Sequence, residues 1–167
     1  MSQHPLVIKT SRDGLVLKQL MPDDASAYFE LLDEDREHLS QHNDKTAKKY
    51  PYEAIVRDSI MSPSNPYKMR FGIWDGDTFV GMVGLKPLGN RIGETGGWTG
   101  KRFCRMGYAT VTRRALATFA IKKLGYRRIV AETHPKNTES QEMLIKVGFK
   151  LVERRDDSHH FIFVPEK

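Results

Sequence analysis

A basic loop runs through a glycine into an amphipathic helix at residues 104–110. Apolar residues at helical spacing indicate the helix, namely Leu116, Phe119, Ala120 and Leu124. A helix that begins at a glycine presents unpaired backbone N–H groups and the positive end of its dipole. Gly107 lets a ligand approach the backbone closely, and Arg102 and Arg105 add positive charge. The segment therefore predicts a binding site for a phosphate or pyrophosphate group.

A second helix is predicted to begin at Asn137 and to end at Gly148. Asn137 is a favourable N-cap, and Gly148 stands where a left-handed glycine commonly ends a helix. Met143, Leu144 and Val147 would form its buried face. The distance along the chain from Gly107 fits a helix, a strand and then this second helix.

Residues 104–109 resemble the signature Gln/Arg-x-x-Gly-x-Gly/Ala of the GNAT superfamily of acyl-CoA N-acyltransferases. In that family the signature cradles the pyrophosphate of acetyl-CoA at the start of the central helix. Gly107 and Ala109 match it, whereas Cys104 stands in place of Gln or Arg. The missing charge would have to come from Arg102 or Arg105.

Three further segments resemble the GNAT branch that acetylates the N-termini of ribosomal proteins. They are Asn-x-x-Ser leading to Gly-Phe within 137–149, Gly-Glu-Thr-Gly-Gly-Trp at 93–98, and Arg-Glu-His-Leu at 36–39. The resemblance implies an N-acetyltransferase that moves an acetyl group from acetyl-CoA directly to a primary amine in a ternary complex. The acceptor would be a protein N-terminus or a small-molecule amine, and a homodimer is compatible with this branch.

The resemblance assigns catalytic roles to two residues. Ser140 is expected to protonate the departing sulfur of coenzyme A, and Glu94 is expected to act as a base or to bind the amine. Glu132 and ordered water are the rivals of Glu94 as the base. The alternative for Ser140 is hydrogen bonding at the helix end, and for Glu94 a solvent-facing position on a strand.

Binding roles follow from the same resemblance. Arg36, His38 and Leu39 are expected to border the acceptor. The residues expected to bind acetyl-CoA are Trp98, Thr99, Arg102, Cys104, Arg105, Met106, Gly107, Tyr108, Ala109, Thr110 and Asn137.

Two other kinds of chemistry are disfavoured. Cys104, between two arginines, could have a lowered pKa and act as a nucleophile, but direct aminolysis of a thioester requires no nucleophile from the enzyme. No metal site is expected, because His159 and His160 have no third ligand spaced with them.

Composition is that of a soluble globular protein. The 167 residues are 39% hydrophobic and 29% charged, which suits one domain with a full core. No apolar run approaches the roughly 18 residues of a membrane helix, and residues 1–5 lack the features of a signal peptide. A single cysteine excludes an internal disulfide framework, so a cytoplasmic location is expected.

The net charge of +6 favours an anionic partner. Basic pairs at 113–114, 122–123 and 127–128 are interpreted as solvated helix faces that also attract a polyanionic cofactor. No aromatic residues alternate with them, which disfavours nucleic acid. Two rival functions remain open: a catalytically inactive acyl-CoA-binding sensor, and a basic module that binds RNA or the ribosome.

The elements that must position these residues follow the order β-α-α-β-β-β-α-β-α-β-β. This order predicts a mixed α/β, GNAT-like domain over 15–165, with a mostly antiparallel sheet flanked by helices, after an N-terminal extension at 1–14. Helices are predicted to open at Pro22 and Pro51, and the polar stretch 38–49 is predicted to lie outside the core. Gly96-Gly97 predicts a β-bulge that leaves the backbone open to a ligand. The expected strands are 15–20, 69–74, 78–87, 91–99, 128–133, 149–154 and 160–164.

Overall fold

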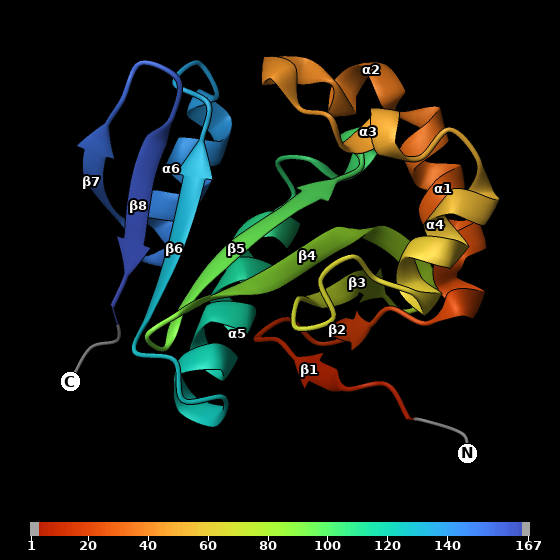
Figure 1. The fold of residues 1–167 in the computed structure, drawn as a ribbon, viewed down its shortest axis with the longest axis horizontal. Helices are drawn as coiled ribbons and strands as arrows, with labels where there is room; N and C mark the ends of the chain where they lie inside the picture. The colour runs from red at the N-terminus through yellow and green to blue at the C-terminus, as the bar shows by residue number, and fades with distance from the viewer. Residues whose placement is uncertain (1–3, 165–167) are drawn as a thin grey trace.

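One sheet of eight strands runs through residues 4–164, the part of the chain that the computed structural model describes (Figure 1). The spatial order is β1-β2-β3-β4-β5-β6-β8-β7. Neighbouring strands are antiparallel except for β5 and β6, which are parallel and are joined through a helix. The strands are β1 (Val7–Lys9), β2 (Leu15–Gln19), β3 (Met69–Asp75), β4 (Thr78–Gly89), β5 (Ile92–Thr99), β6 (Arg128–Thr133), β7 (Lys150–Arg154) and β8 (His159–Phe163).

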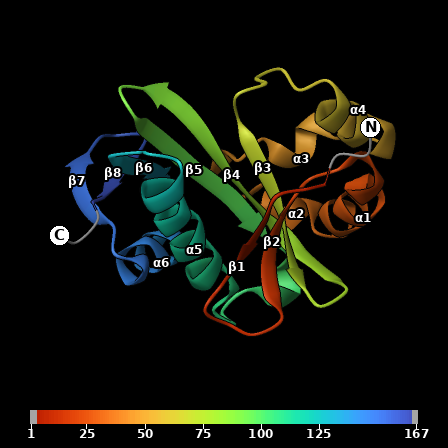
Figure 2. The ribbon, with the colours of Figure 1, turned by 90° about the horizontal axis from the view of Figure 1, so that it is seen from below.

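Helices cover both faces of the sheet (Figure 2). The longest, α5 (Tyr108–Lys123), packs with α6 (Thr138–Val147) on one face, around Leu85, Leu116 and Ile129. On the other face Tyr28, Leu32 and Trp98 belong to a second apolar cluster. The helices of that side are α1 (Ala25–Glu34), α2 (Arg36–Leu39), α3 (Thr46–Lys49) and α4 (Glu53–Met61).

Strands β5 and β6 diverge in the middle of the sheet. They pair from Ile92 with Arg128 to Glu94 with Val130, and beyond these residues they separate, as Figure 1 shows. Within residues 4–164, the second half of β5, residues 95–99, therefore has no strand partner on its β6 side. Backbone polar groups on that edge are left for a ligand or water.

The fold class and the order of the main elements predicted from the sequence are confirmed. The predicted strands lie within two residues of the observed bounds, and β6 is matched in full. Residues 7–9, which were assigned to an N-terminal extension, form β1 and pair with β2. None of the helices within residues 4–164 is long and apolar enough to cross a membrane.

Two local predictions are wrong. The polar stretch 38–49 forms short helical turns, and these bury Leu39 and Ala47 in the second apolar cluster. The bulge predicted at Gly96-Gly97 is absent, since both residues pair in regular register with β4, whose irregularity lies between Pro87 and Gly89. Gly97 instead allows the backbone of Met82 to approach β5 closely, because a Cβ at position 97 would clash with the carbonyl oxygen of Met82.

Candidate active site

The loop between β5 and α5 is held in a defined shape at the N-terminus of the helix. Gly107 precedes α5 in the left-handed conformation, with φ of 84°. Arg12, in the turn between β1 and β2, donates from Nη2 to the carbonyl oxygen of Met106 at 2.9 Å. The same guanidinium lies over the ring of Tyr108, whose hydroxyl donates to Asp75 at 2.6 Å. The loop therefore presents the free N–H groups of the first turn of α5 in a fixed arrangement.

The N-terminus of α6 faces the same region. The side-chain oxygen of Asn137 accepts a hydrogen bond from the backbone N–H of Ser140 at 3.1 Å, as expected of an N-cap. Ser140 lies in the first turn and is half-buried. The first turn of α6 and the end of β5 therefore line the same cavity.

A cavity of about 800 Å³, here called the cleft, lies between these two helix starts and the free edge of β5. Its size is within the usual range for a cofactor site. Residues assigned from the sequence to acetyl-CoA, to catalysis and to the acceptor meet here. Those that line it are Trp98, Thr99, Cys104, Arg105, Gly107, Ala109, Thr110, Asn137, Ser140, His38 and Leu39.

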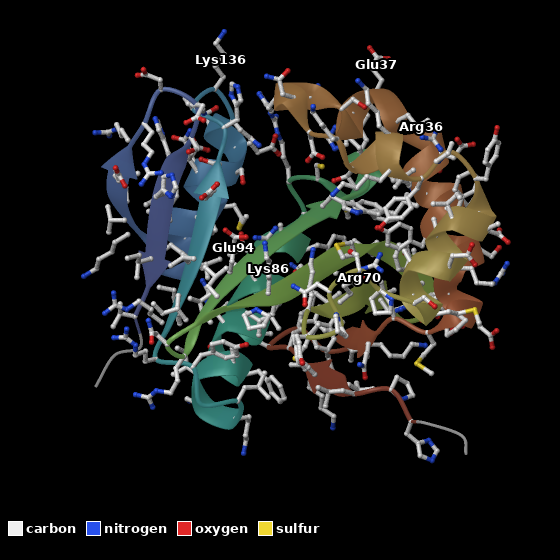
Figure 3. All side chains as sticks on the ribbon, in the orientation of Figure 1. Arg36, Glu37, Arg70, Lys86, Glu94 and Lys136 are labelled. Carbon is white, nitrogen blue, oxygen red and sulfur yellow. The ribbon has the colours of Figure 1, made fainter. Side chains whose placement is uncertain are left out.

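Five residues assigned from the sequence do not line the cleft, and one of them, Glu94, lines a second cavity described below. Arg102 lies 4.0 Å from Glu34, and the side chain of Met106 is exposed. Tyr108 is buried beneath the loop. Arg36 donates to the carbonyl oxygens of Ala47 and Tyr50 at 2.8 and 2.6 Å. Figure 3 shows Arg36 beside α1 and α2, far from Glu94. The hydrogen bonds of Arg36 connect α2 with α3 and the residue that follows it, and so stabilise the helices around the site.

Cys104 lies where its thiol is kept protonated. Its sulfur is 3.5 Å from Nε2 of His38. Burial raises the pKa of Cys104, and the negative charges of Glu139 and Asp35 act in the same direction. Arg105 lowers the pKa of Cys104 but is the smallest of these influences, and its guanidinium lies 3.7 Å from Glu139. The structure therefore gives no support to a nucleophilic thiolate at this position.

Arg113 is a residue of the cleft that the sequence analysis missed. It is buried, and the interpretation of residues 113–114 as a solvated helix face is wrong for it. Its Nε has no hydrogen-bond partner within residues 4–164, and burial lowers its pKa to about 10. Nη2 lies 3.1 Å from the position that a Cβ at Gly97 would take. The signal was present, since Arg113 is three residues before Leu116 and seven before Ala120 on the buried helix face.

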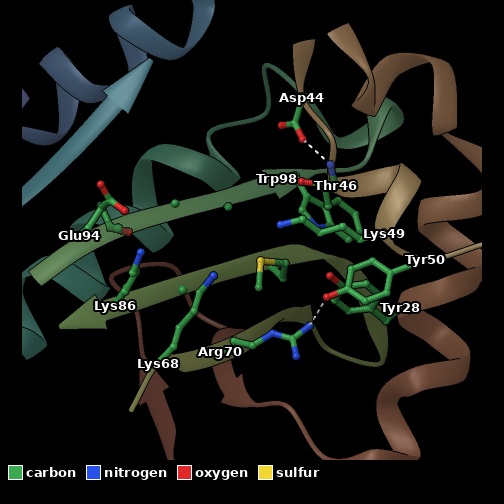
Figure 4. A pocket seen from close by; sticks show the side chains of 15 residues that line it. Tyr28, Asp44, Thr46, Lys49, Tyr50, Lys68, Arg70, Lys86, Glu94 and Trp98 are labelled. Carbon is green, nitrogen blue, oxygen red and sulfur yellow. Dashed lines mark hydrogen bonds between the residues drawn. The ribbon is translucent and has the colours of Figure 1, made fainter. Parts of the chain in front are cut away.

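A second cavity of about 220 Å³, here called the basic pocket, opens on the α1 side of the sheet (Figure 4). It is lined by Lys49, Lys68, Arg70, Lys86, Asp44, Glu94, the aromatic residues Tyr28, Tyr50 and Trp98, and backbone of β4 and β5. The two cavities share Asp44, Met82, Gly97 and Trp98 as lining residues. The cations of this pocket were not predicted, because they come from separate segments of the chain.

The structure separates the two candidate catalytic residues between the cavities. Glu94 lines the basic pocket opposite Lys86, and Ser140 lines the cleft. Glu132 contacts His160 at 3.4 Å and lines neither cavity. A reaction that uses both Glu94 and Ser140 would take place where the cavities meet, beside Gly97 and Trp98.

Comparison with known proteins gives a family and a set of related folds. A family model described as an acetyltransferase (GNAT) domain matches residues 14–150. No curated protein matches the sequence significantly. Among solved structures, the ribosomal alpha-N-protein acetyltransferase RimL in complex with coenzyme A superposes with a TM-score of 0.84 at 16% identity, covering 95% of this chain and 98% of that one.

Two other solved structures are similar over nearly the whole chain. RimJ of Mycobacterium smegmatis has a TM-score of 0.75 at 19% identity, with 97% of this chain and 90% of that chain covered. An acetyltransferase of Salmonella typhimurium that modifies the N-terminal serine of a 50S ribosomal protein has a TM-score of 0.77 at 16% identity, with coverage of 96% and 100%. At these identities the likeness shows the fold alone.

Proposed function

Because the chain belongs to the GNAT acetyltransferase family, we propose that it transfers an acetyl group from acetyl-CoA to a primary amine. The observation that carries this proposal is the cleft, which runs from the N-terminus of α5 to the free edge of β5 and there meets a second cavity. Such an arrangement lets the two substrates approach one another from opposite faces of the sheet. The domain responsible is the one predicted over 15–165.

The residues of the cleft fit coenzyme A. Its pyrophosphate would lie at the first turn of α5, where Gly107 keeps the backbone accessible and Arg105 adds positive charge. The amides of its pantetheine arm would run along residues 95–99 of β5, whose edge lacks a strand partner. Arg113 and Asn137 supply side-chain donors on either side.

Coenzyme A supplies the acetyl group as a thioester, and the residues of this chain would move the protons. The amine nitrogen attacks the thioester carbonyl carbon, so that a C–N bond forms and the C–S bond breaks. Glu94, directly or through water, would accept the proton that the amine loses, and Ser140 would give a proton to the departing sulfur. Backbone N–H groups beside Trp98 would stabilise the negative charge that develops on the carbonyl oxygen.

A protein N-terminus is the acceptor favoured by the resemblance to the ribosomal-protein branch, and small amines are the alternative. Two of the similar structures are described as acetyltransferases that modify the N-terminus of a ribosomal protein. The rival functions are an acyl-CoA sensor without catalysis and an RNA-binding module. A cytoplasmic location agrees with an acceptor of this kind.

Thermal unfolding with and without acetyl-CoA tests the cofactor, with an adenine dinucleotide as the control. At about 100 times Kd the ligand stabilises the fold by roughly 2.7 kcal/mol, which raises the melting temperature of a domain of this size by about 5–10 °C. Ser140→Ala should keep that shift and lower turnover of amine substrates at least about tenfold.

The outcomes separate the rivals. No shift with millimolar acetyl-CoA would contradict the proposed function, and binding to RNA that weakens with salt would then favour the nucleic-acid module. If acetyl-CoA raises the melting temperature but no amine tested leads to release of coenzyme A, the sensor would be favoured. Unchanged turnover of Ser140→Ala would remove Ser140 from the mechanism while leaving the acetyltransferase in place.

A further inference from the structure

The basic pocket holds more positive than negative charge. Four cations, Lys49, Lys68, Arg70 and Lys86, line it together with two carboxylates, Asp44 and Glu94. None of the four cations has a carboxylate oxygen within 4.0 Å in residues 4–164. The excess positive charge in the pocket is therefore available to a ligand.

These cations are close enough to act on one another. Partial burial lowers the pKa of Lys68, and the charges of Arg70, Lys49 and Lys86 lower it further. Figure 4 shows Lys68 and Lys86 rising over the same stretch of β4, with Lys49 reaching inward from α3. A bound anion would relieve this repulsion.

One of the cations is fixed, and one buried donor is unused. Arg70 donates from Nη1 to the backbone and side-chain oxygens of Ser59 at 3.2 and 3.1 Å, and from Nη2 to the hydroxyl of Tyr50 at 3.2 Å. These neutral partners hold the guanidinium without cancelling its charge. The indole Nε1 of Trp98 is buried at the junction with the cleft and has no hydrogen-bond partner in the described part of the chain.

The floor of the basic pocket is bare backbone. Gly84 of β4 and Gly96 of β5 are directly paired and both line the pocket. A Cβ at Gly84 would lie 3.2 Å from the side chain of Lys68, so a side chain there would crowd the cation. The paired glycines let a ligand lie flat against the sheet beside Lys68 and reach Trp98.

We propose that the acceptor is a primary amine that carries a carboxylate or phosphate group, and that the basic pocket binds this anionic group. This inference rests on the proposed function. Lys68, Lys86 and Arg70 bind the anion over the glycine floor, and the amine end of the acceptor extends along β5 toward the junction with the cleft at Trp98. An acidic peptide N-terminus and a small phosphorylated or carboxylated amine share this chemistry.

Matched pairs of probes test the charge preference. The peptide pair is Ser-Glu-Glu-Ala-Gly and Ser-Gln-Gln-Ala-Gly, both with amidated C-termini so that only the Glu side chains supply carboxylates, and the small-molecule pair is phosphoethanolamine and ethanolamine. Binding is measured by calorimetry on the protein saturated with coenzyme A, and turnover is measured by release of coenzyme A from acetyl-CoA. We expect the anionic member of at least one pair to bind about tenfold more tightly or better, and the pair that shows the preference identifies the source of the anion.

Charge-neutral variants locate the effect. Lys68→Gln and Lys86→Gln, which keep most of the aliphatic stem, should each reduce the preference for the anionic probe severalfold. Lys123→Gln removes the same charge from an exposed position at the end of α5 and should leave the preference unchanged. The thermal shift with acetyl-CoA checks that each variant is folded and binds the cofactor.

The failure of this inference can be told from the failure of the proposed function. If acetyl-CoA binds but neither anionic probe binds more tightly than its neutral partner, the inference is overturned and the acetyltransferase stands. A loss of preference as large in Lys123→Gln as in Lys68→Gln would also overturn it, because the effect would then be one of overall charge. If acetyl-CoA does not bind, both proposals fall.

Discussion

Arg113 carries a guanidinium into the buried wall of the cleft, and no carboxylate of residues 4–164 pairs with it. Its side chain is buried, and its Nε has no partner within residues 4–164. Burying a charge is costly unless the charge is paired and hydrogen-bonded. The pKa of Arg113, lowered by burial to about 10, still leaves the group charged at neutral pH. The free-energy cost of burying this charge beside Gly97 would be offset when the guanidinium binds acetyl-CoA.

Arg113→Met tests whether the buried charge lowers the free energy of unfolding and raises the affinity for acetyl-CoA. Methionine fills a similar volume without charge, so the ligand-free protein should become more stable by roughly 1–4 kcal/mol. The affinity for acetyl-CoA should fall, because the cleft loses its buried donors. Urea unfolding measures the first effect and calorimetry with acetyl-CoA the second.

A neighbouring arginine supplies the control for that prediction. Arg114 is exposed and donates to the carbonyl oxygen of Lys146 at 2.7 Å, so Arg114→Met should show neither gain in stability nor loss of affinity comparable to Arg113→Met. A ligand-free Arg113→Met protein that is less stable than the parent would mean that water already satisfies the guanidinium.

Single residues were predictable from the sequence where a local pattern determines them. The N-cap role of Asn137 and the positive φ of Gly148 at the end of α6 followed from helix-end chemistry alone. Glu94 and Lys86 could not be related to Lys68 and Arg70, since the grouping of these residues depends on strand register and on the segment that precedes β3. The lowered pKa considered for Cys104 is contradicted for a similar reason, because its burial and the approach of Glu139 from α6, which both raise the pKa, depend on the tertiary fold.

At the scale of elements, the beginning of α5 depends on a turn at the opposite edge of the sheet. Arg12 lies between β1 and β2, yet it donates to Met106 and lies over the ring of Tyr108. A Cβ at Gly107 would fall 2.6 Å from Nη2 of Arg12, so the glycine is required both for its positive φ and for this contact. Residues 7–14, which the sequence placed in an extension, are thus part of what shapes the anion site.

Arg12→Ala should weaken acetyl-CoA binding about tenfold, because a charge-assisted hydrogen bond to the loop is lost and the loop must be ordered when the ligand binds. The loss of overall stability should be small, since the contact is on the surface. Hydrogen exchange should show faster amide exchange across residues 104–107, and calorimetry should show the weaker binding.

Arg155→Ala is the matched control. It removes an exposed arginine whose side chain lies 3.0 Å from Glu153, far along the chain from the loop. Equal affinities of Arg12→Ala and the parent protein would show that the loop keeps its shape without Arg12.

Most elements were predictable because their patterns are local. Alternation of apolar residues and the Asp-Gly turn located β3 and β4 to within two residues, and capping located α6. Strand β1 has only three residues and forms because β2 offers it an edge. The predicted bulge is absent because Gly97 is required by the close approach of the Met82 backbone, and a sequence cannot distinguish such a glycine from one in an irregular strand.

At the scale of the whole molecule, the sheet separates two apolar clusters and carries one cavity toward each side. Tyr28 ties α1 to the sheet on the side of the basic pocket. Its ring packs edge-on against Tyr50 and Trp98, with centroids 5.6 and 5.3 Å away. The two cavities meet at Trp98, so the packing around Tyr28 also determines the shape of the junction.

Tyr28 should make the fold sensitive to alkali. Burial raises the pKa of Tyr28 from its usual value near 10 to about 12, with Tyr50 acting in the same direction. The folded state therefore favours the neutral phenol. The stability that this provides is fully present below pH 10 and is lost as the pH rises from 10 to 12. The loss amounts to about 3 kcal/mol.

Tyr28→Phe should remove this part of the pH dependence. The free energy of unfolding, measured by urea at intervals between pH 9 and 12, should fall less steeply in the variant than in the parent. Tyr52→Phe is the control, because that side chain is 70% exposed and its replacement should leave the slope unchanged. The same slope in parent and Tyr28→Phe would mean that the fold opens around Tyr28 before its hydroxyl ionises. The contact between α1 and the sheet would then be the weakest part of the molecule at high pH.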